Sequence, residues 1–139
     1  MVENKKILVL DASVLIKWII LETEGRALVE EMKIQYLKGE IGIHIPGFAL
    51  WEVNNYLGRN NSSIAITLFS QLQMYHFEEH HLTLEVTSIA FEIMHSTPKI
   101  SFYDASYHAL ALSTGGTFVT ADKGYYNKAK KWKHIKLLK

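Results

Sequence analysis

The sequence predicts an α/β fold, a three-layer α/β/α sandwich in which a central, mostly parallel sheet lies between two layers of helices. Two observations predict it. Short apolar runs that suit buried strands alternate with longer segments whose apolar residues recur at helical spacing. The first run, Ile7 to Leu10, contains no polar residue, which is typical of a strand covered on both faces in a parallel sheet.

Each expected element has its own local signal. The expected strands are short segments at residues 7–10, 43–45, 75–77, 117–120 and 135–138, of which the first is apolar throughout. The expected helices cover residues 13–20, 24–38, 46–58, 64–73, 83–95, 103–112 and 125–132. Leu28, Met32 and Tyr36 mark the apolar stripe of the second helix, and Pro46 stands where the third is expected to begin. The pair Gly115–Gly116 ends the helix before the fourth strand.

The composition predicts one ordinary globular domain spanning residues 1–139. Hydrophobic residues make up 48% of the chain and charged residues 21%, and there is no cysteine, which excludes a disulfide framework and a thiolate metal site. No run approaches the roughly 20 apolar residues of a membrane span, and no signal peptide is recognisable, so we expect a cytoplasmic protein without membrane contact. The net charge of +1 is too small to indicate a nucleic-acid partner on its own, although lysines and no acidic residue follow Asp122.

Four acidic residues stand at or near the starts of expected helices: Asp11, Glu52, Asp104 and Asp122. Asp11 and Asp122 lie just beyond two expected strands, at the strand ends where parallel sheets bind ligands. Four carboxylates in one crevice repel one another unless a divalent cation lies between them, and carboxylate oxygens suit Mg²⁺ or Mn²⁺. Considered alone, each aspartate is equally well explained as a residue that caps or stabilises the N-terminus of its helix. Glu52 alone is equally well explained as a charged surface residue.

The four acids lie within four short phrases, at residues 8–15, 46–55, 103–111 and 118–123. Together and in this order, the phrases resemble those of the PIN-domain ribonucleases, and in particular the VapC toxins of prokaryotic toxin–antitoxin pairs. The resemblance implies an Mg²⁺- or Mn²⁺-dependent endoribonuclease that hydrolyses RNA phosphodiester bonds and leaves a 5′-phosphate. It also implies that the four acids form the catalytic metal site, that a cognate antitoxin protein binds the chain, and that the chain forms a homodimer. The apolar segment from Trp18 to Leu21 is then a candidate part of the antitoxin groove, although core burial explains it more simply.

Six further residues near the acids are candidate site residues. Three of them carry hydroxyl or amide groups that could support the carboxylates: Ser13, Asn55 and Thr120. Three basic residues are candidate contacts for RNA phosphates: Lys17, Arg59 and Lys123. Local capping accounts equally well for the first three, and ordinary solvated charge is the simpler account of Lys17 and Arg59.

Two other functions fit parts of the pattern. A non-catalytic PIN-like module that binds RNA or protein would be expected to lack one or more of the acids, and all four are present. A phosphatase or phospho-acceptor domain would be expected to carry another acid beside Asp11 or two residues after it, where Ser13 stands. The acids therefore favour the nuclease.

The segment Glu78-Glu79-His80-His81 contains four side chains that can bind metals and is a possible metal cluster. Adjacent residues of an extended segment point to opposite faces, so four in a row rarely bind one ion. The segment is interpreted as a solvated loop, and His44 as an isolated histidine.

Overall fold

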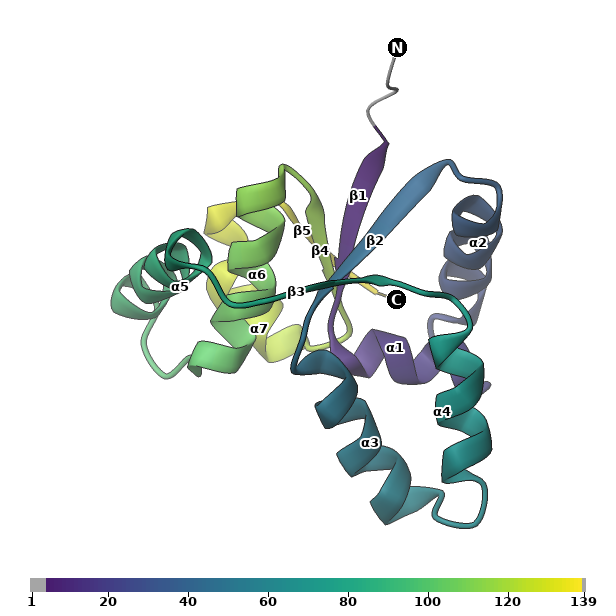
Figure 1. Cartoon of the computed structure of the whole chain (residues 1–139). Coiled ribbons are helices and arrows are strands. Elements are labelled where there is room, and N and C mark those ends of the chain that lie inside the picture. Colours follow the sequence, from purple (N-terminus) through teal and green to yellow (C-terminus); the bar gives the residue numbers. More distant parts are fainter. Residues whose placement is uncertain (1–4, 139) are drawn as a thin grey trace.

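A computed structural model describes residues 5–138 (Figure 1). Within these residues, one sheet contains five strands in the order β3-β2-β1-β4-β5, and all four strand pairings are parallel. The strands are β1 (Lys6–Leu10), β2 (Ile41–Pro46), β3 (Glu78–His80), β4 (Thr117–Thr120) and β5 (Ile135–Leu137). The predicted parallel sheet is therefore confirmed.

Helices cover both faces of the sheet, which confirms the predicted three-layer sandwich. The helices are α1 (Ala12–Ile19), α2 (Arg26–Leu37), α3 (Ala49–Asn60), α4 (Ala65–Gln73), α5 (Leu84–Ser96), α6 (Phe102–Thr114) and α7 (Lys123–Ala129). In Figure 1, α5, α6 and α7 lie on one side of the strands, and α1 to α4 lie on the other. Helix α6 packs against β1, β2 and β4, while α3 and α4 project together away from the sheet.

The central strand β1 carries the tightest packing. Val9 and Leu10 are completely buried, because β1 pairs with β2 on one side and with β4 on the other. At the start of β4, Gly116 lies so close to β1 that a Cβ atom there would be 2.7 Å from the backbone oxygen of Ile7. A side chain of any size at position 116 would therefore push the two central strands apart.

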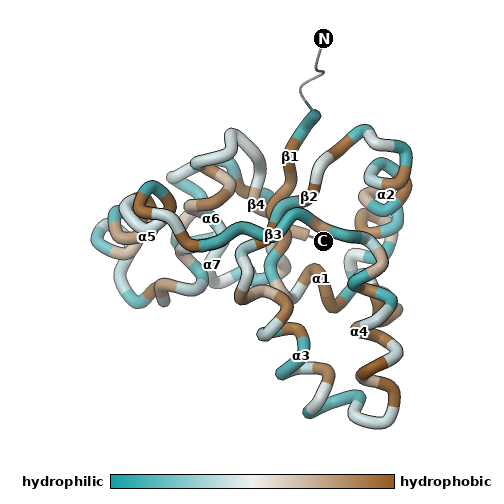
Figure 2. The backbone as a smooth tube through the Cα atoms, in the orientation of Figure 1, coloured by the Kyte–Doolittle hydropathy of each residue, from teal (hydrophilic) through white to brown (hydrophobic). Residues whose placement is uncertain are grey.

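The predicted third strand is wrong in position. The apolar residues Tyr75 and Phe77 do not pair in the sheet; they pack edge-on against Trp18, each with its ring centroid 5.0 Å from that of Trp18. The strand follows them at Glu78–His80, and it is drawn in hydrophilic teal in Figure 2. A charged strand at this position is reasonable because β3 is an edge strand, with one side of its backbone unpaired.

Helix boundaries also differ from the prediction by a few residues, most clearly for α3 and α7. Pro46 is the last residue of β2, and α3 begins three residues later at Ala49, because Pro46 pairs with His80 in the sheet. The helix predicted over 125–132 begins at Lys123 and changes to a 3-10 helix over Lys130–Trp132. Among the described residues, no helix is long and apolar enough to cross a membrane.

Candidate active site

Asp11 stands at the carboxyl end of β1, where it caps the N-terminus of α1. One carboxylate oxygen, Oδ1, accepts a hydrogen bond from the hydroxyl of Ser13 and another from the backbone N–H of Val14 at 3.2 Å. The other oxygen, Oδ2, accepts a hydrogen bond from the hydroxyl of Thr120 at 2.6 Å. The carboxylate is thus held from the first turn of α1 and from the end of β4, which fixes its orientation.

Thr120 links Asp11 to Asp122. Its side chain is completely buried at the end of β4, and its Oγ1 accepts a hydrogen bond from the backbone N–H of Asp122 at 3.0 Å. Asp122 in turn caps α7, since its Oδ1 accepts a hydrogen bond from the backbone N–H of Tyr125 at 3.0 Å. The structure therefore brings Ser13 and Thr120 into contact with the acids, and their supporting role in a metal site stays a prediction.

Asp104 lies in the first turn of α6, whose N-terminus is capped by Ser101. The pKa of the Asp104 carboxyl is raised above its usual value, first by partial burial and next by the nearby Asp122 carboxylate. Burial also raises the pKa of Asp11; its three hydrogen bonds act in the opposite direction, and the charge of Asp104 adds to the rise. The three aspartates therefore share one electrostatic environment.

Glu52 is joined to this group by Tyr107, a residue that the sequence analysis did not single out. The Tyr107 hydroxyl donates a hydrogen bond to Oε1 of Glu52, which brings α3 and α6 together beside the acids. The ring of Tyr107 is buried and stacks on Phe118, with ring centroids 5.7 Å apart. Its pKa is raised by burial, by the Glu52 hydrogen bond and by the charges of Glu52 and Asp11. Tyr107 lies three residues after Asp104, so helical spacing is the signal that could have identified it.

The four carboxylates fit a divalent cation by their chemistry. None of the ion pairs formed by residues 5–138 includes Asp11, Glu52, Asp104 or Asp122, so no basic side chain is paired directly with these carboxylates. Within the same residues, no three of these acids bring ligand oxygens within 4.8 Å of one another. An Mg²⁺ ion that keeps several of its waters would suit such an open arrangement, because it needs only one or two direct carboxylate ligands.

The remaining candidate residues lie farther out. Asn55 and Arg59 are exposed on α3, after Glu52 on the same helix, and Lys123 is exposed in the first turn of α7 beside Asp122. The Lys17 ammonium lies 2.8 Å from Oε2 of Glu22 in a salt bridge. Their contacts with RNA stay predictions, and Lys17 would have to leave Glu22 to make one.

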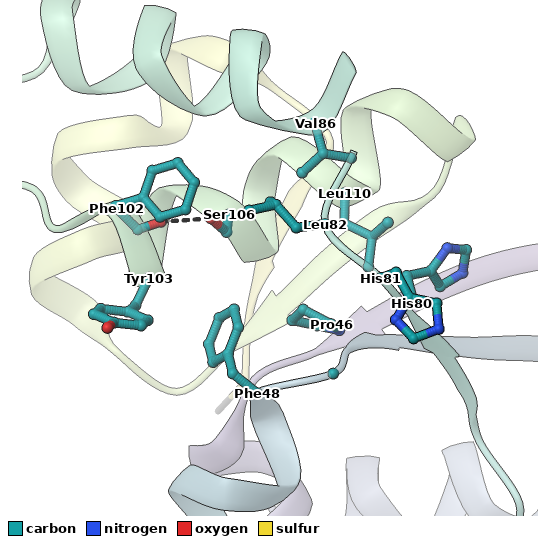
Figure 3. Close-up of a pocket in the computed structure, with 11 residues that line it drawn as sticks. Pro46, Phe48, His80, His81, Leu82, Val86, Phe102, Tyr103, Ser106 and Leu110 are labelled. Atoms are coloured by element: carbon teal, nitrogen blue, oxygen red, sulfur yellow. Dashed lines mark hydrogen bonds between the residues drawn. The ribbon is translucent and has the colours of Figure 1, made fainter. Parts of the chain in front are cut away.

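An apolar pocket of about 440 Å³ opens next to these acids (Figure 3). Figure 3 shows Phe48 and Tyr103 at one end, where their rings meet edge-on at 5.3 Å, and His80 and His81 at the other. None of the four acids lines the pocket, but its residue Phe48 packs against the ring of Tyr107, which binds Glu52, at a centroid distance of 5.0 Å. The other lining residues are Pro46, Gly47, Leu82, Val86, Phe102, Ser106 and Leu110.

The model of one known family, the PIN domain, matches residues 8–131 of the sequence. The chain belongs to the PIN-domain family. This confirms the resemblance drawn from the four acidic phrases. None of the curated proteins matches the sequence.

Solved structures share the PIN fold at low sequence identity. VapBC2 from Rickettsia felis, solved with a DNA fragment from its promoter, matches with a TM-score of 0.72 and 12% identity, over 94% of this chain and 96% of that one. VapC20 from Mycobacterium tuberculosis, described as a sarcin–ricin loop cleaving toxin, matches with a TM-score of 0.62 and 14% identity over 86% and 92%. FitAcB from Neisseria gonorrhoeae matches with a TM-score of 0.65 and 16% identity over 88% and 93%. At these identities the likeness concerns the fold.

The Thr120 hydroxyl can be tested in this PIN domain by isosteric replacement. Thr120→Val keeps the shape of the side chain but removes the hydrogen bonds to Asp11 and Asp122, so we expect the free energy of unfolding to fall by about 1–3 kcal/mol. We expect metal affinity or nuclease activity to fall about 10–100-fold. Thr120→Ser keeps the hydroxyl, so this variant should retain most of the stability, measured by urea unfolding, and most of the activity, measured by cleavage assays. Equal losses in the Val and Ser variants would show that the hydroxyl is unimportant.

The hydrogen bond from Tyr107 to Glu52 is tested by Tyr107→Phe. Removing the hydroxyl removes the hydrogen bond that joins Glu52 to α6. We expect nuclease activity to fall about tenfold while the fold is retained. Tyr36→Phe is the matched control, because it also removes a tyrosine hydroxyl, which donates to the backbone oxygens of Tyr75 and His76, away from the acids. Initial cleavage rates over a range of Mg²⁺ concentrations measure the effect. Equal rates for the two variants would count against the role given to Tyr107.

Proposed function

We propose that this PIN domain is an Mg²⁺- or Mn²⁺-dependent endoribonuclease that hydrolyses RNA phosphodiester bonds. The observation that carries the proposal is the environment of Asp11. Its carboxylate is oriented by Ser13, Val14 and Thr120, while its pKa is raised by burial and by Asp104. A protein rarely keeps a desolvated carboxylate beside other carboxylates without a function for it.

The residues around the proposed centre have separable tasks. Asp11, Glu52, Asp104 and Asp122 would hold the ion, which when bound activates a water molecule and neutralises charge on phosphate oxygens. Ser13 and Thr120 keep the Asp11 oxygens in place, and Tyr107 directs Glu52 toward the aspartates. Fixed orientation of this kind lowers the reorganisation needed during the reaction.

The proposal extends to RNA as substrate and to an antitoxin as partner, which would make the chain the toxin of a type II toxin–antitoxin pair acting in the cytoplasm. The support is the fold shared with VapC20, described as a toxin that cleaves the sarcin–ricin loop, and with VapBC2. The exposed basic side chains of Arg59 and Lys123 would contact RNA phosphates.

Exposed apolar side chains on the projecting pair α3 and α4 support a protein partner. Trp51, Ile66 and Met74 are between 75% and 80% exposed, so their apolar surfaces are available for burial by an antitoxin or a second copy of the chain. By contrast, Trp18 is 2% exposed. Burial in the core, and not an antitoxin groove, therefore explains the apolar residue at the start of the segment Trp18 to Leu21. Leu21, at its other end, is exposed.

Cleavage of a defined panel of RNAs with Mg²⁺, Mn²⁺ or a chelator tests the proposal. We expect internal cuts that require the ion and leave 5′-phosphate ends, detected by ligation to an adaptor that accepts only such ends. Cleavage that persists in chelator would contradict the metal requirement. Tight binding of RNA or of the co-expressed antitoxin, with no cleavage under any of these conditions, would instead indicate the non-catalytic PIN-like module.

A further inference from the structure

A second group of side chains that can bind a metal lies at the β3 edge of the sheet, on β2 and β3. In the parallel pairing of these strands, His44 of β2 is the register partner of Glu78 of β3, and His80 follows Glu78 by two residues. Side chains two residues apart on a strand point to the same face. The register therefore brings two imidazoles and one carboxylate together, although His44 is 34 residues from Glu78 in the sequence.

The three side chains are in direct contact. Nε2 of His44 lies 2.9 Å from Oε2 of Glu78, Nδ1 of His44 lies 2.8 Å from Nε2 of His80, and Nε2 of His80 lies 3.8 Å from Oε2 of Glu78. One ligand atom from each residue lies within 4.8 Å of the other two, and among residues 5–138 this is the only such set of three. The first two distances use different ring nitrogens of His44, and one ion would take only one of them. Ligands on a tetrahedral zinc ion are about 3.3 Å apart, which lies within the 4.8 Å that one atom from each residue satisfies.

The surroundings leave room for an ion and access to it. The His44 and His80 side chains are 16% and 31% exposed, and the Glu78 side chain is 64% exposed. Gly42, two residues before His44 on the same face of β2, has no side chain, and a Cβ atom there would lie 3.6 Å from Nε2 of His44. The absence of a side chain at position 42 leaves the ring nitrogen open on that side.

We propose that His44, Glu78 and His80 form a binding site for a divalent transition-metal ion of the zinc class, separate from the acidic centre. Two imidazole nitrogens and a carboxylate oxygen are a donor set that zinc accepts, whereas Mg²⁺ prefers oxygen donors and near-octahedral geometry. Three protein ligands leave one tetrahedral position for water or for a group from a partner. The ion would replace the direct contacts that His44 now makes with Glu78 and His80.

The ion would join the edge strand to the rest of the sheet. Strand β3 has three residues and, within the described chain, pairs with β2 alone, so little else holds it in register. His80 also lines the apolar pocket beside the acidic centre. An ion held by His80 would therefore fix one wall of that pocket.

Titration of the tag-free, metal-stripped chain with ZnCl₂ in a calorimeter tests this site. The titrations are made with the wild type and with the Asp11→Asn variant, so that weaker binding of Zn²⁺ at the acidic centre can be distinguished from binding at the histidine cluster. In both proteins we expect one equivalent of Zn²⁺ to bind at the histidine cluster. We expect His80→Asn and Glu78→Gln to weaken binding by at least about tenfold in the Asp11→Asn background, since even residues that only support metal ligands cost about 10–100-fold.

His81→Asn is the matched control, because His81 is adjacent to His80 but outside the cluster. It should bind Zn²⁺ as the parent protein does. Co²⁺ substitution gives a second readout: the visible absorption of a tetrahedral Co²⁺ site should be present with His81→Asn and lost with His80→Asn, and far-UV circular dichroism checks that each variant is folded. Equal Zn²⁺ affinity in the two histidine variants, or no binding by the parent, would overturn the proposal.

Discussion

The variant Asp11→Asn is expected to lose Mg²⁺-dependent RNA cleavage by about 100-fold or more, because a direct metal ligand should matter at least as much as the residues that orient it. Asparagine has nearly the shape of aspartate, and its amide can stay within reach of the hydroxyls of Ser13 and Thr120. The substitution removes the negative charge of the Asp11 side chain. Cleavage rates of a defined RNA, measured with saturating Mg²⁺ and with Mn²⁺, give the comparison.

The stability of the same variant separates loss of function from loss of fold. Burial raises the pKa of Asp11 above 3.8, so its protonated form stabilises the folded state below that pH, and this contribution is lost as the pH rises through the raised pKa. At neutral pH without divalent ions, ionised Asp11 therefore disfavours folding, and asparagine avoids that cost. We expect the free energy of unfolding of Asp11→Asn to equal or exceed that of the wild type under these conditions. Undiminished cleavage by the folded variant would refute the proposed site.

A large effect on stability is expected from Gly116→Ala. The added Cβ would meet the Ile7 backbone oxygen at 2.7 Å and its Cγ2 at 2.9 Å, between the two central strands. Backbone atoms in a sheet cannot move aside cheaply, so we expect the free energy of unfolding to fall by about 1–3 kcal/mol. Urea unfolding followed by circular dichroism measures the change.

Gly58→Ala provides the matched control for Gly116→Ala. Gly58 lies inside helix α3, and no heavy atom lies within 4 Å of a Cβ atom placed there. Alanine is the better helix former, so this variant should gain about 0.5–1 kcal/mol. A Gly116→Ala protein as stable as the wild type would mean that β1 and β4 can separate more easily than their packing indicates.

The parts of the fold that the sequence predicts well are those with strong local signals. The run from Ile7 to Leu10 is apolar because β1 is covered on both faces, and β4 carries the apolar pair Phe118 and Val119 between two threonines. The third strand fails this rule. Glu78 to His80 form an edge strand that is polar, while the nearby apolar Tyr75 and Phe77 are used to pack against Trp18. Apolar pattern finds buried strands, and it cannot distinguish a polar edge strand from a loop.

The candidate site shows the same division between local and long-range information. The strand-end positions of Asp11 and Asp122 and the hydroxyl of Thr120 follow from the order of elements along the chain. The bond from Tyr107 to Glu52 depends on how α6 packs beside α3, which no local pattern records. The histidine cluster depends on long-range pairing in the same way: the segment around His80 by itself resembles a loop, and the third member of the cluster, His44, comes from the neighbouring strand.

The hydrogen bond between Thr120 and Asp11 joins residues 109 positions apart in the chain. During synthesis, the first partner leaves the ribosome long before the second has been translated. A nascent chain that has not reached position 122 lacks Asp122 and cannot complete the group of four acids, so a product that ends before this position is expected to be inert. The proposed RNA cleavage would therefore begin only after position 122 has been translated.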